Sequence, residues 1–134
     1  MCSACHSGPH FSDFKFHTVV YPQAGPGKNG FGTDYGRFNF THDFNDFNRF
    51  RTPPLHNVEK TGPYGHSGSV FELADAIIGH YDPFTLFDFE NMSGHQRREL
   101  FQRMVSIPET QAVPSQLSDK ELFDLIAFLK TLSF

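Results

Sequence analysis

The two cysteines of the chain, Cys2 and Cys5, stand three positions apart, and His6 follows the second one directly. Thiolates and imidazoles bind metal ions, and a pair of thiols can also form a disulfide or two thioether bonds. Four chemistries therefore compete for this C-x-x-C-H stretch: zinc binding, thiol–disulfide exchange, a structural disulfide and the covalent attachment of haem.

The remaining sequence favours the last of these four. A zinc site would need two further ligands, for which only His10 and His17 are near, at an unusual spacing. A thioredoxin-like pair follows a strand in a βαβ pattern, which is not visible here. A disulfide across two residues closes a loop too short to stabilise much. Haem attachment needs two thiols about one helical turn apart and a neighbouring histidine for the iron, and Cys2, Cys5 and His6 supply them.

The bulk properties limit the classes of function. A chain of 134 residues suits one domain, and its formal net charge of -4 argues against nucleic acid as a partner. No apolar run approaches the roughly 18 residues that a membrane span requires. No leader segment with charged and apolar regions precedes Cys2. We therefore predict a single domain over residues 1–134 that is one part of a longer protein.

Residues 1–62 show little periodicity and are rich in turn-forming residues, as in the segment 22–30. Hydrophobic content is 38%, which predicts a modest core, and 17 residues are Phe. The Phe residues between Phe38 and Phe50 recur every two to four positions, which fits neither a helix nor a strand. We predict a loop there, anchored by aromatic side chains that pack against the edge of a haem.

Three segments have helical periodicity. The first runs from Ser69 to about His80, the second covers 94–105, and the third begins at the capping box formed by Ser118 and Glu121. Their predicted apolar faces are Val70, Leu73, Ala74, Ile77 and Ile78; Leu100, Phe101 and Met104; and Leu122, Leu125, Ile126, Leu129 and Leu132. The predicted fold class is all-α, a c-type cytochrome domain with long irregular loops around one haem.

The stretch from Phe50 to Asp82, FRTPPLHNVEKTGPYGHSGSVFELADAIIGHYD, resembles one particular family. It is similar to the C-terminal haem domain of the bacterial dihaem cytochrome c peroxidases and MauG-type enzymes. There, F-K-T-P-x-L-R-N-V-x-x-T-x-P-Y-x-H-D-G precedes the helix that carries the sixth iron ligand. Segments 11–14, 34–37 and 124–132 resemble the family as well. Two positions depart from its pattern: His56 replaces an Arg, and Ser67 replaces an Asp.

The resemblance implies a sixth ligand for the iron. Counting along the family pattern from Leu73 places it at His80, where some relatives have Met and others Tyr. Tyr81, one residue further on, is the alternative, followed by Met92 and Met104. Ligation by two histidines would give a lower haem potential than His/Met ligation, because thioether sulfur favours ferrous iron.

Other residues take roles that the resemblance or their chemistry suggests. Thr61 and Pro63 match residues whose carbonyls bind Ca²⁺ between the two haem domains of relatives. Arg37 is a candidate partner for a haem propionate. His66 is expected to be a hydrogen-bonded structural residue. The remaining histidines that lack a motif are expected on the surface or in loops: His10, His17, His42 and His95.

The resemblance implies an electron-transfer role. In the family, peroxide is reduced at a haem in the N-terminal domain, and the C-terminal haem relays electrons to it from a small donor such as a cytochrome or cupredoxin. With one C-x-x-C-H, this chain would hold the relay haem alone, and we expect negligible peroxidase turnover by the isolated chain. A free-standing monohaem carrier or sensor subunit is the alternative. Because haem c is attached outside the cytoplasm, the expected compartment is the periplasm.

Overall fold

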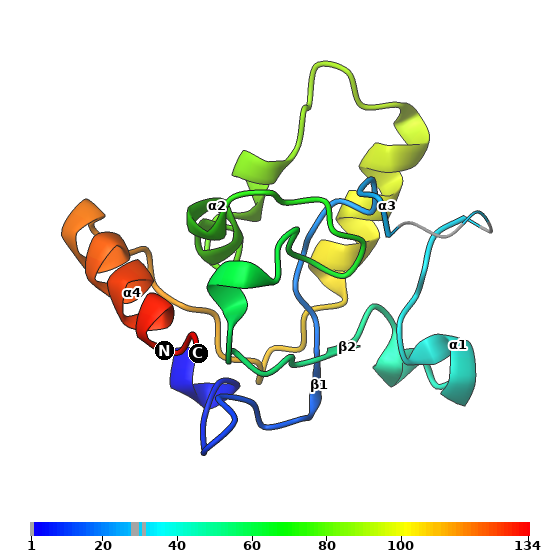
Figure 1. Cartoon of the computed structure of the whole chain (residues 1–134). Helices are drawn as coiled ribbons and strands as arrows, with labels where there is room; N and C mark the ends of the chain where they lie inside the picture. Colours follow the sequence, from blue (N-terminus) through cyan, green and yellow to red (C-terminus); the bar gives the residue numbers. More distant parts are fainter. Residues whose placement is uncertain (1, 28–29, 31) are drawn as a thin grey trace.

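Short helices joined by long loops make up the chain, as the computed structural model shows for residues 2–27, 30 and 32–134 (Figure 1). In chain order the first half contains the 3-10 helix η1 (Cys2–Ala4), strand β1 (Phe16–His17), helix α1 (Phe38–Thr41), the 3-10 helix η2 (Phe44–Asp46) and strand β2 (Phe50–Arg51). The second half contains the 3-10 helix η3 (Val58–Lys60), helix α2 (Leu73–Ile78), the 3-10 helix η4 (Pro83–Leu86), and helices α3 (Gly94–Val105) and α4 (Asp119–Thr131).

The two longest helices begin at capping boxes. The Ser118 side chain accepts from the Glu121 amide while the Glu121 carboxylate accepts from the Ser118 amide, and Ser93 and Gln96 do the same for α3. The predicted start of α4 and the predicted bounds of α3, residues 94–105, are therefore confirmed. None of the helices among the described residues has the length and apolarity that a membrane crossing needs.

The helix predicted over 69–80 is shorter than expected. Val70 exchanges backbone hydrogen bonds with Tyr64 in an isolated antiparallel bridge, and Glu72 is extended, so α2 starts at Leu73. Gly79 ends the helix, and a further turn brings His80 and Tyr81 to backbone hydrogen bonds with Ile77 and Ile78. His80 thus lies just beyond the end of α2, on a turn whose direction the helix fixes.

The first half of the chain differs from the prediction in two ways. Phe38–Thr41 is a single helical turn where we expected a loop. β1 and β2 pair in antiparallel fashion, with Phe16 opposite Arg51 and His17 opposite Phe50, so the fold is not all-α. Aromatic residues suit the pleated surface of a strand, and the pairing joins two segments far apart in sequence. Phe40 and Phe44, expected to pack inside, are 88% and 81% exposed.

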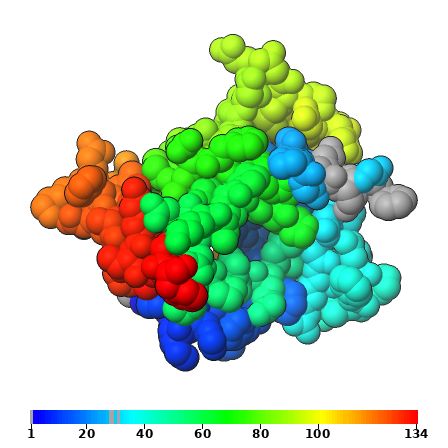
Figure 2. All heavy atoms as spheres, viewed as in Figure 1, coloured from blue at the N-terminus to red at the C-terminus, as the bar shows by residue number. Residues whose placement is uncertain are grey.

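The interior contains about as many polar as apolar side chains. The buried apolar residues are Val20, Val70, Ala76, Leu100 and Leu129, and the buried polar ones are Ser12, Thr18, Asn48, Thr52, Ser67 and Arg103. On α3 the buried pair is Leu100 and Arg103, whereas Phe101, predicted to face the core, is 66% exposed. Arg103 can be buried because its Nη1 donates to the Tyr21 carbonyl at 3.1 Å. Figure 2 shows this face of the molecule hollowed near its centre.

Candidate haem site

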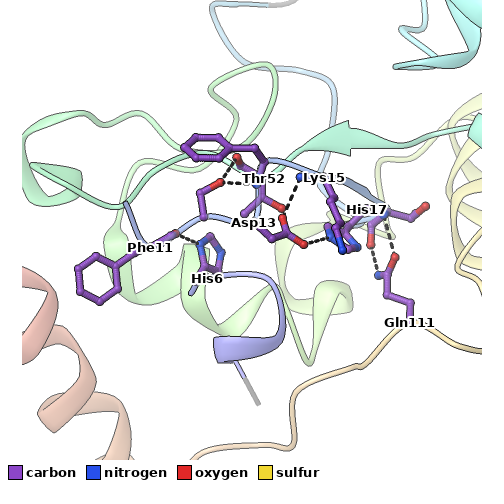
Figure 3. A network of polar contacts seen from close by, with 10 residues as sticks. His6, Phe11, Asp13, Lys15, His17, Thr52 and Gln111 are labelled. Carbon is purple, nitrogen blue, oxygen red and sulfur yellow. Dashed lines mark hydrogen bonds and ion pairs between the residues drawn. The ribbon is translucent and has the colours of Figure 1, made fainter. Parts of the chain in front are cut away.

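The turn at the start of the chain positions Cys2, Cys5 and His6 together. The amides of Cys5 and His6 donate to the Cys2 carbonyl at 3.2 and 2.9 Å, so the two thiols lie one turn apart. The His6 ring lies against the Phe11 carbonyl, with its Nδ1 at 2.9 Å (Figure 3). A carbonyl only accepts hydrogen bonds, so Nδ1 carries the proton and Nε2 keeps a lone pair that can bind a metal.

The two cysteines do not have the properties of a redox-active pair. Both are free thiols; Cys2 is exposed and Cys5 is part-buried. Burial raises the pKa of the Cys5 thiol, and the charges of Asp13 and Cys2 raise it further. Thiols that take part in disulfide exchange have a lowered pKa, because the thiolate is the nucleophile. The environment of Cys5 therefore argues against thiol–disulfide exchange.

His80 approaches from the opposite side, beyond the end of α2. Its Nδ1 lies 2.8 Å from the Ala76 carbonyl oxygen and 3.0 Å from the Tyr21 hydroxyl. Burial lowers the pKa of the His80 imidazole, and the charge of His6 acts in the same direction, although the hydrogen bond to Ala76 opposes it. The ring is therefore neutral near pH 7, which is the form that binds a metal ion.

The rings of His6 and His80 are close neighbours in an edge-on arrangement. Their centroids are 6.3 Å apart, and the ring planes are inclined by 66°. Two metal–nitrogen bonds of about 2 Å each, plus the half-widths of two imidazole rings, add up to roughly 6 Å. Since Nδ1 of each ring is occupied by a backbone carbonyl, each ring has Nε2 left for an iron between them. These residues fit a haem iron bound on both faces by histidine.

The other candidates for the sixth ligand have no such relation to His6. Within the described ranges, Tyr81 forms no ring pair with either histidine. Met92 lies in the loop before α3, and Met104 lies within α3. His80 is thus the candidate whose ring the structure brings beside His6.

A second group of side chains lies beside Cys5. Ligand atoms of Cys5, Asp13 and His17 all lie within 4.8 Å of one another, and His17 Nε2 is 2.8 Å from the Asp13 carboxylate (Figure 3). His17 was expected among surface and loop residues, and its place in this part-buried pair corrects that expectation. His10, the other histidine considered for zinc, packs instead against Phe14 and His56. Three donors are one fewer than a structural zinc site uses.

The pKa of Asp13 reflects opposing effects. Burial alone would raise it, but hydrogen bonds from the His17 ring, the Lys15 amide and the Thr52 side chain outweigh burial and lower the pKa. The carboxylate is therefore ionised and accepts from its neighbours, at 2.9 Å from the Lys15 amide. The spacing of Asp13 and His17, four residues apart in a non-helical segment, gives no sequence signal for this pair.

The remaining predicted residues lie away from the two histidines or have other partners. Arg37 Nε is 2.9 Å from the Asp46 carboxylate, and its guanidinium lies 4.7 Å from the centre of the Phe16 ring. Arg37 also lines a cavity of about 370 Å³ together with His17. Thr61 and Pro63 lie on an exposed turn after η3. His66 is hydrogen-bonded to Asp34 at 2.7 Å, the structural arrangement expected for it.

One residue of the site was not found from the sequence. Tyr21 contacts the His80 ring with its hydroxyl, and the two ring centroids are 5.8 Å apart. It follows β1 in a segment of turn-forming residues, and no motif marks it. Its position depends on contacts with α2 and α3, which lie more than fifty residues further along the chain.

Comparison with known proteins gives several matches. No protein-family model matches the chain. Over 79 residues it is 44% identical to cytochrome c551 peroxidase of Pseudomonas aeruginosa, covering 57% of this chain and 22% of that protein. Over 133 residues it is 32% identical to methylamine utilization protein MauG of Methylorubrum extorquens, covering 98% of this chain and 30% of that protein. It is 29% identical over 153 residues to cytochrome-c peroxidase IdrP2 of Denitromonas iodatirespirans, covering 98% of this chain and 36% of that protein.

Solved structures resemble the chain in the same way. A MauG-like protein associated with microbial copper homeostasis superposes with a TM-score of 0.68 at 28% identity, over 98% of this chain and 42% of that one. The dihaem peroxidase BthA of Burkholderia thailandensis gives a TM-score of 0.67 at 21% identity, over 98% and 38%, a likeness of fold. The chain spans from about a fifth to just over a third of the length of the curated relatives named above.

Proposed function

The chain belongs to the family of the cytochrome c peroxidases and MauG proteins, and from this premise we propose that it is an electron-relay haem c domain. The observation that carries the proposal is the pair of neighbouring imidazoles, His6 and His80, whose centroids are 6.3 Å apart. Each ring has its Nδ1 against a backbone carbonyl and its Nε2 available. Two imidazoles at this separation suit an iron bound on both faces.

Four residues would hold the haem. Cys2 and Cys5 would form the thioether bonds, and His6 and His80 would bind the iron on its two faces. When bound, the haem supplies a reversible one-electron change between ferric and ferrous iron. The chain's own contribution is to orient both imidazoles through their Nδ1 hydrogen bonds, so that the coordination would be the same in both oxidation states. An unchanged coordination keeps the structural rearrangement small and suits electron transfer.

Two histidine ligands leave no coordination position for peroxide. We therefore propose that this domain does not itself reduce peroxide and that it passes electrons to a second, peroxidatic haem in an N-terminal domain of a longer protein. The length of the relatives, which extend well beyond the matched region, supports such a domain. A small electron-donor protein, a cytochrome or cupredoxin, is the proposed source of electrons, and the periplasm is the proposed compartment, because haem c is attached outside the cytoplasm.

Two further binding roles are proposed on weaker support. Arg37 lines a cavity together with His17, and His17 lies close to Cys5. The Arg37 guanidinium now pairs with the Asp46 carboxylate, and it could pair with a haem propionate instead. The carbonyls of Thr61 and Pro63 lie on an exposed turn and are hard oxygen ligands suited to Ca²⁺ at a domain boundary.

Optical spectroscopy of the haem-loaded protein tests the central proposal. We expect the reduced spectrum of a covalently bound haem c and a ferric near-infrared band typical of two imidazole ligands. A thioether or phenolate band instead would show that the sixth ligand is a methionine or Tyr81. Rapid peroxide reduction by the chain with a small artificial donor would overturn the relay role, because it requires an open position on the iron.

The alternative function is a free-standing monohaem carrier. The absence of a second C-x-x-C-H motif from the reading frame of the gene would favour it, whereas a second motif upstream would favour the dihaem enzyme. The relay domain and the monohaem carrier would share the His6–His80 pair, so the optical experiment does not distinguish these two functions. The gene sequence does distinguish them.

A further inference from the structure

Tyr21 is packed against the turn that carries His80. The guanidinium of the buried Arg103 donates to the Tyr21 carbonyl at 3.1 Å, which fixes the backbone of Tyr21. The edge of its ring lies so close to Gly79 that a Cβ there would come within 2.9 Å of Tyr21 Cε1. The ring is inclined by 83° to the imidazole of His80. The hydroxyl therefore reaches His80 from a rigid position.

Three polar atoms meet at the end of this side chain. The Tyr21 hydroxyl oxygen lies 2.5 Å from the Ala76 carbonyl oxygen and 3.0 Å from His80 Nδ1. His80 Nδ1 itself lies 2.8 Å from the same carbonyl oxygen. Only two of these atoms can carry a proton, because a carbonyl oxygen is an acceptor.

The geometry assigns both protons. The hydroxyl has a single proton, and its shortest contact is to the Ala76 carbonyl, so that proton points to Ala76. The hydroxyl then presents a lone pair to His80, and Nδ1 faces two acceptors. An unprotonated Nδ1 would place three lone pairs against one another, whereas a protonated Nδ1 donates to either oxygen. The proton of the neutral imidazole is therefore on Nδ1, and the lone pair is on Nε2.

We propose that Tyr21 is the positioning residue that fixes the tautomer and the ring orientation of His80, so that Nε2 is held ready for the iron. The proposal rests on the proposed function, in which His80 is the sixth ligand. Hydrogen-bond partners of metal-bound histidines act in this way, and their loss commonly weakens the metal–ligand bond about 10- to 100-fold.

The test compares two Tyr→Phe substitutions in the haem-loaded protein. Tyr21→Phe removes the hydroxyl at His80 and keeps the ring. Tyr64→Phe is the matched control, because the Tyr64 hydroxyl also donates to a backbone carbonyl, that of Val58 at 3.0 Å, and has no contact with His80. Cyanide, which binds ferric iron in place of a displaced ligand, is the probe. We expect Tyr21→Phe to tighten cyanide binding about 10-fold or more and Tyr64→Phe to change it less than twofold.

A second measurement does not depend on the variant being folded. In the ferrous, diamagnetic wild-type protein with ¹⁵N-labelled histidine, the His80 ring should show a proton bound to Nδ1 that exchanges slowly with water. Cyanide binding equal in Tyr21→Phe and wild type, or a His80 ring without a proton on Nδ1, would overturn the proposal. A wild-type spectrum without two imidazole ligands would overturn the proposed function first, and with it the role of Tyr21, so the two failures are distinguishable.

Discussion

The two histidines of the proposed site, each with its Nε2 available, are held by different kinds of support. His6 lies in a loop that is held mainly by polar contacts. These are the contact of its own ring with the Phe11 carbonyl, the hydrogen bond from the Ser12 hydroxyl to the Thr52 carbonyl at 2.8 Å, and the pair formed by Asp13 and His17. Phe11 itself takes a left-handed backbone conformation with φ of 50°, which is costly for a residue with a side chain.

His80 is held by close packing as well as by its contacts with the Ala76 carbonyl and the Tyr21 hydroxyl. Ala76 is buried on α2, and Gly79 lets Leu86 and Tyr21 approach the backbone closely. The two histidines thus have different surroundings: polar contacts in a loop around His6, and a closely packed helix end around His80. The following substitutions separate the two supports, from the largest expected effect to the smallest.

Covalent haem attachment should depend wholly on the thiols of Cys2 and Cys5. Replacing Cys2→Ser and Cys5→Ser together removes both thioether bonds, so we expect the denatured protein to retain no haem, measured by its mass and by the absorbance that remains after acid–solvent extraction. Ser3→Ala, in the same turn, is the control and should keep its haem. Covalent haem in the double variant would show that attachment does not use these thiols.

The helix side should set the redox potential. His80→Met exchanges imidazole for thioether sulfur, and we expect the midpoint potential to rise, within the range of about 0.8 V that axial ligands cover. Potentiometric titration followed by absorbance measures it. Tyr81→Phe should leave the potential and the spectrum unchanged. If Tyr81→Phe altered the spectrum and His80→Met left the potential unchanged, the sixth ligand would be Tyr81 and not His80.

The packing around His80 should tolerate no added atom. Gly79→Ala places a Cβ 2.5 Å from Leu86 Cδ1 and 2.9 Å from Tyr21 Cε1, although the φ of -58° suits alanine. We expect a loss of about 1–3 kcal/mol in the free energy of unfolding, measured with denaturant, because overpacking forces neighbours to move. Gly94→Ala, which would meet only the end of Arg98 at 3.7 Å, is the control and should be neutral or slightly stabilising. Equal effects at both positions would contradict the close packing at Gly79.

The loop around His6 should make the free energy of unfolding sensitive to acid, through Asp13. Because the pKa of Asp13 is lowered in the fold, its contribution to stability is complete above the unfolded value of about 4 and is lost as the pH falls through the folded value. Asp13→Asn should cost about 1 kcal/mol at neutral pH and flatten the pH dependence of unfolding below about pH 4. Asp124→Asn on the exposed face of α4 is the control. An unchanged acid limb in Asp13→Asn would rule out this contribution.

The parts of the molecule that local chemistry determines were predictable from the sequence. The capping boxes at Ser93 and Ser118 mark where α3 and α4 begin, because the side-chain partners are three residues away. The C-x-x-C-H motif is equally local, and the family register pointed to His80, whose role as a ligand stays a prediction. These features need no knowledge of how distant segments pack.

What escaped prediction depends on contacts across the fold. Arg103 is buried because the Tyr21 carbonyl, 82 residues away, accepts its proton, and the periodicity of α3 could not show that. The hydroxyl of Tyr21 finds His80 at a separation of 59 residues. The helix predicted to start at Ser69 begins later, because Val70 is paired with Tyr64 instead.

The meeting of the two ends of the chain has a consequence for the order of maturation. The ring of Phe11, whose carbonyl accepts from His6, packs against Phe128 of α4, and the Asn57 amide donates to the Leu132 carbonyl. A contact across more than a hundred residues forms late, since its loop must close and its second half must first emerge. We therefore expect the turn of Cys2 and Cys5, whose hydrogen bonds are local, to form before α4 packs against Phe11.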